Sequence, residues 1–155
     1  VLFQDLLLIK RQGQRVFPWH QDFGFWPIDR PLGVVFWVPL QASDGDRGAL
    51  RFARGSHRLG PQAVVDLHTG RTQQGDELAF DADAWPLYSP TYAPGDVVAF
   101  SPVTFHASPA MARPGERAAW SCIFLSPEAR WSHANAPNHP LCKVVADGAP
   151  VTEVF

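Results

Sequence analysis

Short apolar runs separated by turn residues make up most of the hydrophobic pattern of this chain. The clearest run, VVFWVPL at 34–40, is β-branched and aromatic and is stopped by a proline. Runs of this length and composition are typical of β-strands. The pattern therefore predicts strands over residues 6–9, 34–40, 49–53, 97–100 and 117–125.

Turn residues indicate how these strands connect. SDGDRG at 43–48 separates two of the runs, so the strands at 34–40 and 49–53 are expected to form a hairpin. PGD at 94–96 and RPG at 113–115 predict tight turns, each followed by another strand. The chain is thus expected to consist of strands joined by glycine- and proline-rich turns.

Two long segments lack a regular pattern. Residues 60–95 contain many prolines and glycines, and a connection of this length inside a compact domain is usually a functional lid or a disordered excursion. We therefore predict a lid-like insertion at 60–95 and a tail at 126–155 that wraps the domain. The length fits one domain, 1–155, and the absence of a starting Met indicates truncation at the N-terminus.

Composition favours an all-β fold and argues against several partners. The chain has 15 prolines and 12 glycines, which argue against a helical bundle, and its 46% hydrophobic residues suffice for a core. A net charge of -2, with 13 basic residues in no runs, gives no electrostatic footprint for nucleic acid or an anionic membrane. No apolar stretch of about 18 residues or signal peptide is present, so a cytoplasmic location is expected.

The stretch PWHQD at 18–22 carries the first candidate chemistry. If it is extended, His20 and Asp22 lie on one face of a strand while Gln21 points away. An imidazole and a carboxylate on one face are half of a metal site, although such a pair is also common as a hydrogen-bonded surface pair. A second imidazole would complete a two-histidine, one-carboxylate triad that leaves positions of Fe(II) open. His106 is the best candidate for it.

Two further residues follow His106 at suggestive positions. Ser108 lies on the same face as His106 if that strand continues. Arg117 begins the next predicted strand, and a hairpin returning over this interval can place its guanidinium beside the metal, where it would grip a dicarboxylate through two hydrogen bonds. Early and late ligands of this kind converge in a double-sheet jelly roll, in which strands distant in sequence are neighbours in space.

Four parts of the sequence carry a resemblance to a known family. They are, in chain order, WHQDFGFWP, VVFWVPLQASDGDRGALRFARGSHRLG, PGDVVAFSPVTFHAS and the single residue Arg117. Together they resemble the phytanoyl-CoA dioxygenase family of Fe(II)- and 2-oxoglutarate-dependent oxygenases, from about Leu6 to Leu125. The resemblance implies a double-stranded β-helix, also called a jelly roll or cupin-like fold, with long loops. The helical portion usual upstream in the family has no counterpart here.

The resemblance also implies roles for individual residues. His20, Asp22 and His106 correspond to the iron ligands, and Arg117 with Ser108 to the anchor for the distal carboxylate of 2-oxoglutarate. Further positions of the cosubstrate pocket are matched by Gln21, Trp37 and Lys10. The implied cofactors are Fe(II), 2-oxoglutarate and O2.

The implied reaction is hydroxylation of an unactivated C–H bond of a small organic substrate, with release of succinate and CO2. Hydroxylation is expected rather than halogenation, because halogenating relatives lack the carboxylate ligand that Asp22 supplies here. Two alternatives remain at this point: a non-catalytic cupin-like binding or structural protein, and a Zn(II) hydrolase or isomerase on the same ligands. The sequence indicates neither the substrate nor the oligomeric state.

Overall fold

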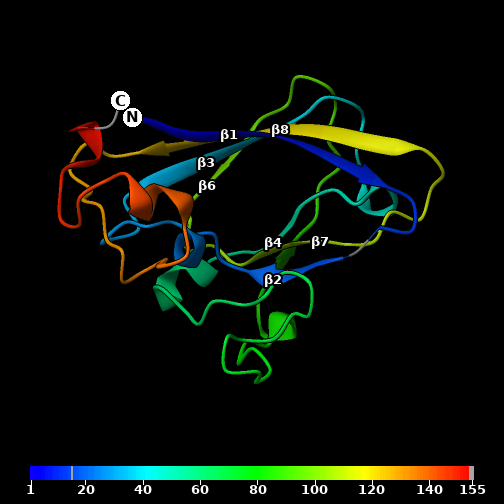
Figure 1. The fold of residues 1–155 in the computed structure, drawn as a ribbon. Helices are drawn as coiled ribbons and strands as arrows, with labels where there is room; N and C mark the ends of the chain where they lie inside the picture. Colours follow the sequence, from blue (N-terminus) through cyan, green and yellow to red (C-terminus); the bar gives the residue numbers. More distant parts are fainter. Residues whose placement is uncertain (15, 154–155) are drawn as a thin grey trace.

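Two four-stranded antiparallel sheets face each other (Figure 1), as expected for the predicted all-β jelly roll. The computed structural model describes residues 1–14 and 16–153. Among these residues no helix is long and apolar enough to cross a membrane. The major sheet has the order β1 (Leu2–Arg11), β8 (Glu116–Leu125), β3 (Gly33–Pro39), β6 (Val98–Phe100). The minor sheet has the order β2 (Phe17–His20), β7 (His106–Ser108), β4 (Arg51–Ala53), β5 (Leu87–Tyr88).

Strands adjacent in sequence lie in different sheets, except that β4 and β5 both belong to the minor sheet. The predicted hairpin between 34–40 and 49–53 is therefore wrong: β3 lies in the major sheet, whereas β4 pairs with β5 and β7 in the minor sheet. The physical reason is that both edges of β3 are already occupied, by β8 and by β6. The segment between them, which contains the short 3-10 helix η2 (Gly45–Arg47), crosses from one sheet to the other.

The space between the sheets is filled by every second residue of the long strands. Along β8 the inward positions from Arg117 to Leu125 are buried, whereas Trp120 and Phe124 on the other face are exposed. This alternation is the two-residue period of a strand with one buried face. The register places Lys10 opposite Arg117 and Trp37 opposite Ser121, so these side chains share the interior.

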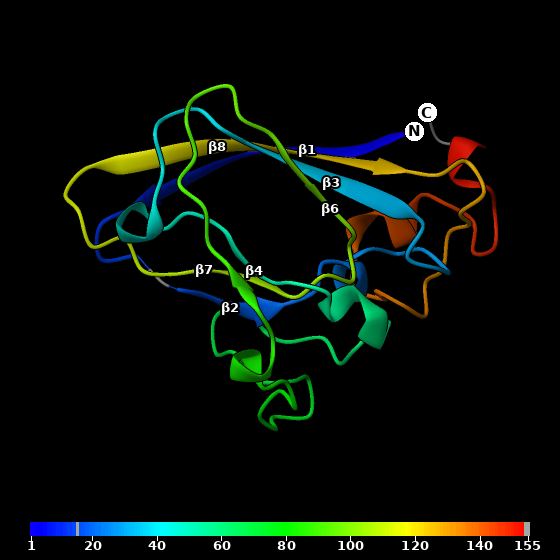
Figure 2. The ribbon, with the colours of Figure 1, turned by 180° about the vertical axis from the view of Figure 1, so that it is seen from behind.

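The segment 60–95 is not wholly irregular, because β5 joins the minor sheet at its edge. The part before β5 lies beyond the minor sheet, on the side away from the major sheet, whereas the part after β5 runs back toward β6 of the major sheet (Figures 1 and 2). Phe80 attaches it there by stacking on Phe105, with ring centroids 3.8 Å apart, and by packing on Trp19 at 5.8 Å. Whether the segment acts as a lid stays a prediction.

The tail after β8 folds back over one end of the sheets, close to the N-terminus (Figure 1). Up to residue 153, where the described part of the chain ends, it contains two 3-10 helices, η5 (Pro140–Lys143) and η6 (Val151–Glu153). Trp131 fixes it, since this side chain is 1% exposed, packs on Phe3, and belongs to a residue that bridges to Ile28. The remaining 3-10 helices are η1 (Phe23–Phe25), η3 (Ser56–Leu59) and η4 (Ala82–Ala84).

We predict that Trp131→Ala destabilises the fold by about 3–5 kcal/mol, because it removes a large buried side chain and leaves a cavity. Val144 lies in the same tail but is 73% exposed, so Val144→Ala is the control and should change stability by less than about 0.5 kcal/mol. Urea unfolding of the three proteins measures both effects. Equal stability of the two variants would show that the tail does not pack as described.

Candidate metal centre and cosubstrate pocket

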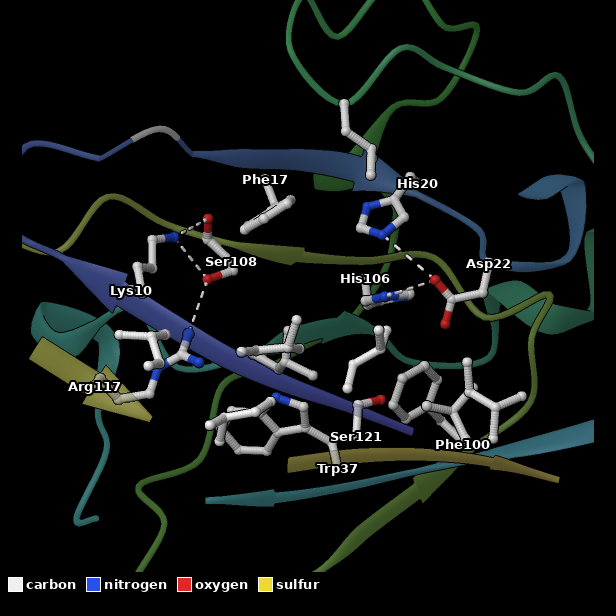
Figure 3. A pocket seen from close by; sticks show the side chains of 18 residues that line it. Lys10, Phe17, His20, Asp22, Trp37, Phe100, His106, Ser108, Arg117 and Ser121 are labelled. Atoms are coloured by element: carbon white, nitrogen blue, oxygen red, sulfur yellow. Dashed lines mark hydrogen bonds and ion pairs between the residues drawn. The ribbon is translucent and has the colours of Figure 1, made fainter. Parts of the chain in front are cut away.

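His20, Asp22 and His106 meet inside the barrel (Figure 3). His20 lies opposite His106 in the pairing of β2 with β7, and their ring centroids are 4.2 Å apart. The Nε2 atom of each histidine lies 3.6 Å from Oδ1 of Asp22. One ligand atom from each residue falls within 4.8 Å of the others, as a shared metal ion requires.

Backbone carbonyls orient both imidazole rings. Nδ1 of His20 lies 2.7 Å from the carbonyl oxygen of Pro18, and Nδ1 of His106 lies 3.0 Å from that of Thr104. A carbonyl oxygen only accepts, so in each ring the proton resides on Nδ1 and is donated to the backbone. The unprotonated Nε2 atoms then point at Asp22, which is the arrangement of metal-ligating histidines.

Asp22 reaches the site by a turn and not by the strand alternation predicted for it. β2 ends at His20, and Asp22 has helical dihedrals (φ -76, ψ -31) just before η1. The backbone N–H of Phe23 donates to Pro102 at 3.0 Å, which attaches this turn to the loop that leads to His106. The predicted extended conformation is wrong at this residue, yet the carboxylate arrives beside both histidines.

The electrostatics of the three groups suit metal binding. Burial by itself raises the pKa of Asp22, but the neighbouring His106 and His20 outweigh it and leave that pKa below its usual value. Burial lowers the pKa of His106 to about 4, with a smaller lowering effect from the neighbouring His20. At neutral pH His106 is therefore neutral and Asp22 ionised, which are the protonation states of metal ligands.

The donor set fits Fe(II). Two imidazoles and one carboxylate on one side of an ion leave several coordination positions free, and the cluster contains no thiolate that would favour a closed structural zinc site. Aromatic rings of Phe100 and Phe52 pack against His106, with centroids at 4.7 and 6.0 Å. These rings keep that side of the centre dry.

Arg117, Lys10 and Ser108 form a second polar cluster in the same interior (Figure 3). Arg117 enters from the major sheet, because β7 and β8 lie in different sheets. The predicted hairpin from His106 to Arg117 is therefore wrong, although the predicted proximity to Ser108 is found. Nη2 of Arg117 donates to the carbonyl oxygen of Gly48 and lies 3.4 Å from Oγ of Ser108. Its guanidinium carbon lies 5.3 Å from the centroid of the Trp37 ring.

The ammonium group of Lys10 donates its hydrogen bonds to neighbouring atoms of the protein. Nζ donates to the carbonyl and the hydroxyl of Ser108, at 3.1 and 2.8 Å, and to the carbonyl of Pro109. Ser108 in turn donates its hydroxyl proton to Gly48 at 2.7 Å. Burial, with a further contribution from the charge on Arg117, lowers the pKa of Lys10 to about 8. Arg117 is thus the member of this cluster that keeps free donors.

One cavity of about 380 Å³ contains both clusters. Trp37 lines it, and Nε1 of that indole is buried without a hydrogen-bond partner in the described part of the chain. An unpaired buried donor beside a guanidinium fits a ligand that carries acceptor oxygens. This fit agrees with a dicarboxylate cosubstrate, for which Arg117 and Trp37 would supply the donors.

Several lining residues were not singled out from the sequence. Ser121 could have been found, because it lies four positions after Arg117 on one strand and so shares its face. Leu67 could not, since it comes from the unpatterned insertion. The other members missed are apolar residues of the strands and of their ends: Leu6, Leu7, Leu8, Ile9, Phe17, Val35, Leu50, Phe100 and Ile123.

Gln21 does not line the cavity. Its side-chain N–H groups donate to the carbonyls of Gly60 and Val103, at 3.0 and 2.8 Å, and its oxygen accepts from the backbone of Gln62 at 2.8 Å. Gln21 therefore joins the metal-bearing turn to two loops. The structure therefore does not support the contact between Gln21 and the cosubstrate that the resemblance implies.

A sequence model of the phytanoyl-CoA dioxygenase (PhyH) family matches residues 2–119. The chain belongs to this family. Its metal cluster and the cluster of Lys10, Ser108 and Arg117 lie within the matched residues. No curated protein gives a significant match to the sequence.

Solved structures share the fold. The α-ketoglutarate-dependent carbocyclase SnoK from nogalamycin biosynthesis has 18% identity and a TM-score of 0.76, and covers 97% of this chain. The epimerase SnoN, in complex with Fe3+, α-ketoglutarate and nogalamycin RO, has 21% identity and a TM-score of 0.75, over 97% of this chain. EctD from S. alaskensis with bound Fe has 24% identity and a TM-score of 0.64, over 85% of this chain. The matches span 58%, 61% and 47% of those three chains.

Iron and 2-oxoglutarate, the cofactors expected from the sequence, are thus the groups named for these neighbours. The His20, Asp22 and His106 cluster supplies a matching set of ligands in this chain. The neighbours also show that this one fold serves different reactions, since a carbocyclase and an epimerase are among them.

We predict a pH-dependent contribution of Lys10 to stability. Its pKa is about 8 in the folded chain and 10.5 as the ordinary value, so the cost of burying the cation is present in full below about pH 8. Between about pH 8 and 10.5 the folded state releases this proton before the unfolded state does, and the free energy of unfolding rises with pH.

Lys10→Met lacks this group and serves as the reference. The free energy of unfolding of the wild type, relative to Lys10→Met, should increase by up to about 3 kcal/mol across that window. Urea unfolding of both proteins near pH 7 and near pH 10.5 measures the change. A constant difference between them would contradict the lowered pKa.

Proposed function

We propose that this protein is an Fe(II)- and 2-oxoglutarate-dependent oxygenase that hydroxylates an unactivated C–H bond of a small organic substrate. One observation supports this most strongly: a two-histidine, one-carboxylate cluster and a buried arginine share a single cavity. A keto diacid has a metal-chelating end and a carboxylate end, so it is the kind of molecule that uses both.

The chain's own residues bind and orient the reactants. Nε2 of His20, Nε2 of His106 and the carboxylate of Asp22 would hold the iron on one side. Arg117 would hold the distal carboxylate of 2-oxoglutarate with the N–H groups that Gly48 and Ser108 do not use. When bound, iron and 2-oxoglutarate supply an oxidative decarboxylation that consumes O2, yields succinate and CO2 and oxidises a substrate C–H bond.

The cavity walls support this assignment because they are mainly apolar. Phe100, Leu50 and Val35 line the interior beside the two polar clusters. Such walls exclude water and so protect a reactive centre from side reactions. The small-molecule substrate enters the same space, and an uncharged region of wall suits the C–H-bearing part of an organic molecule.

Hydroxylation is the outcome we propose among those open to the family. Asp22 occupies the coordination place that a halide would need, which disfavours halogenation. The epimerase and carbocyclase activities are those of the neighbours, and they show which other products must be sought. A zinc hydrolase or a non-catalytic binding protein on the same triad would have no use for the unpaired donors of Arg117 and Trp37.

The first test uses anaerobic protein given Fe(II) and 2-oxoglutarate. We expect a visible metal-to-ligand absorption band, and succinate formation once O2 is admitted. His20→Ala should abolish both, because it removes a ligand of the triad. His57→Ala is the matched control, since His57 is exposed and lies outside the cavity, and it should keep both. Absence of the band in the wild type, with ester hydrolysis supported by Zn(II), would favour the hydrolase instead.

The second test concerns the carboxylate anchor. Arg117→Gln should weaken 2-oxoglutarate binding by about 10- to 100-fold, because charge-assisted hydrogen bonds to the carboxylate are lost. Titration of the absorption band measures this affinity without a known substrate. Arg11→Gln removes an exposed arginine one residue from Lys10 and should leave the affinity unchanged. Equal affinities for all three proteins would place the anchor elsewhere.

A further inference from the structure

We infer that Gly48 is a positioning residue for the cosubstrate: its backbone carbonyl sets the orientation of Arg117, and only glycine allows the carbonyl to lie there. The inference rests on the proposed function and deepens it. It concerns the segment 44–49, which contains η2 and connects the major sheet to the minor sheet.

The Gly48 carbonyl is the meeting point of the anchor. It accepts from Nη2 of Arg117 and, at 2.7 Å, from the hydroxyl of Ser108. Both lone pairs of this oxygen are therefore used. Nε of Arg117 also points at this segment, 3.5 Å from the carbonyl of Arg47. Held along its Nε–Nη2 edge, the guanidinium leaves Nη1 without a hydrogen bond in the described part of the chain, and that atom can face a carboxylate.

Close packing explains why the residue at 48 has no side chain. Gly48 has φ 66 and ψ 36, in the left-handed region that other residues enter at a cost of about 1–2 kcal/mol. A Cβ built there would lie 2.9 Å from Cδ of Lys10 and 3.0 Å from the carbonyl oxygen of Pro109. A side chain at position 48 must displace either the buried stem of Lys10, whose ammonium is held by three hydrogen bonds, or segment 44–49, and a shift of the segment moves the carbonyl with it.

Asp44 gives the segment its shape. Its Oδ1 and its carbonyl both accept from the backbone N–H of Arg47 at 3.0 Å, and the carbonyl also accepts from Ala49 at 3.0 Å. Asp46 attaches the segment to the turn before β8, since its carbonyl accepts from Ala112 at 2.8 Å. The segment is thus fixed against the end of the β1–β8 strand pair that carries Lys10 and Arg117.

None of these contacts involves the metal ligands. A disturbance at Gly48 should therefore weaken recognition of the distal carboxylate and leave metal binding intact. It should also act through Arg117, so that it has no effect where Arg117 has nothing to hold. These two expectations separate a positioning role from general destabilisation.

The test compares Gly48→Ala with Gly45→Ala. Gly45 lies in the same segment, but a Cβ there meets nothing within 4 Å, and its φ is not in the left-handed region. Affinities are measured by the absorption band of anaerobic Fe(II) protein with 2-oxoglutarate and with 2-oxopentanoate, a keto acid that lacks the distal carboxylate. Fe(II) affinity and the melting temperature are measured on the same samples.

We expect Gly48→Ala to weaken 2-oxoglutarate binding about tenfold or more, with unchanged affinity for 2-oxopentanoate and for Fe(II). Gly45→Ala should change none of the three affinities. In the background of Arg117→Gln, Gly48→Ala should cause no further loss, because both changes remove the same interaction. Equal losses for the two keto acids, additive losses in the double variant, or no loss at all would overturn the inference.

A second variant covers the case in which Gly48→Ala does not fold. Asp44→Ala removes the side-chain acceptor of the Arg47 backbone N–H and so loosens the segment without introducing a clash, and it should weaken 2-oxoglutarate binding in the same selective way. If it does not, the inference fails while the proposed function stands. Absence of the band in the wild-type protein would instead refute the proposed function, and the inference with it.

Discussion

Burial of charged side chains between the two sheets is the constraint on which this structure depends. Lys10 and Arg117 lie in the interior, each only 3% exposed, and among the described residues neither forms a salt bridge to an acid. A buried cation without an acid costs free energy unless dipoles compensate. Here the carbonyls of Gly48, Ser108 and Pro109 compensate in part. The interior is thus left with a surplus of positive charge that an anion would satisfy.

The metal cluster also places a charged group between the sheets, but there the charge is negative. Asp22 is the one carboxylate in it, and each of its histidines is held by a backbone carbonyl. The cavity therefore has an acidic ligand set in one part and two cations in another. A keto diacid complements both parts, because one end chelates the metal that the acidic part would hold and the other end is a carboxylate that the two cations attract. The geometry and the family assignment therefore agree on such a molecule.

The fold makes this separation possible. The metal ligands come from β2, β7 and the turn after β2, on the minor sheet. Lys10 and Arg117 come from β1 and β8 of the major sheet. Each cluster is fixed by its own backbone contacts, the metal site through Pro18 and Thr104 and the anchor through Gly48. The two halves of the site can therefore vary independently, which suits a fold whose members carry out different reactions.

The sequence by itself determined the longer strands, because their apolar runs extend over enough residues to be recognised. The run at 34–40 corresponds to β3 and the run at 117–125 to β8, because each is a run of mainly apolar residues that includes β-branched or aromatic side chains. Strand β5, with two residues, is too short to show a period and was not predicted as a strand, and β7, with three, was expected only as a possible continuation of the chain from the strand at 97–100. The metal ligands were found because residue type and spacing carry that information locally.

Only the tertiary structure decided how these parts meet. The predicted strand at 49–53, which contains β4, pairs within the minor sheet because both edges of β3 are occupied. No local sequence pattern encodes this choice. Asp22 enters the site through a turn held by Pro102, and Gln21 is drawn away by distant carbonyls. Gly48 read as an ordinary turn residue, yet its carbonyl lies against Arg117 of another strand. Contacts of this kind depend on packing between segments remote in sequence, and that packing is the information a single sequence does not display.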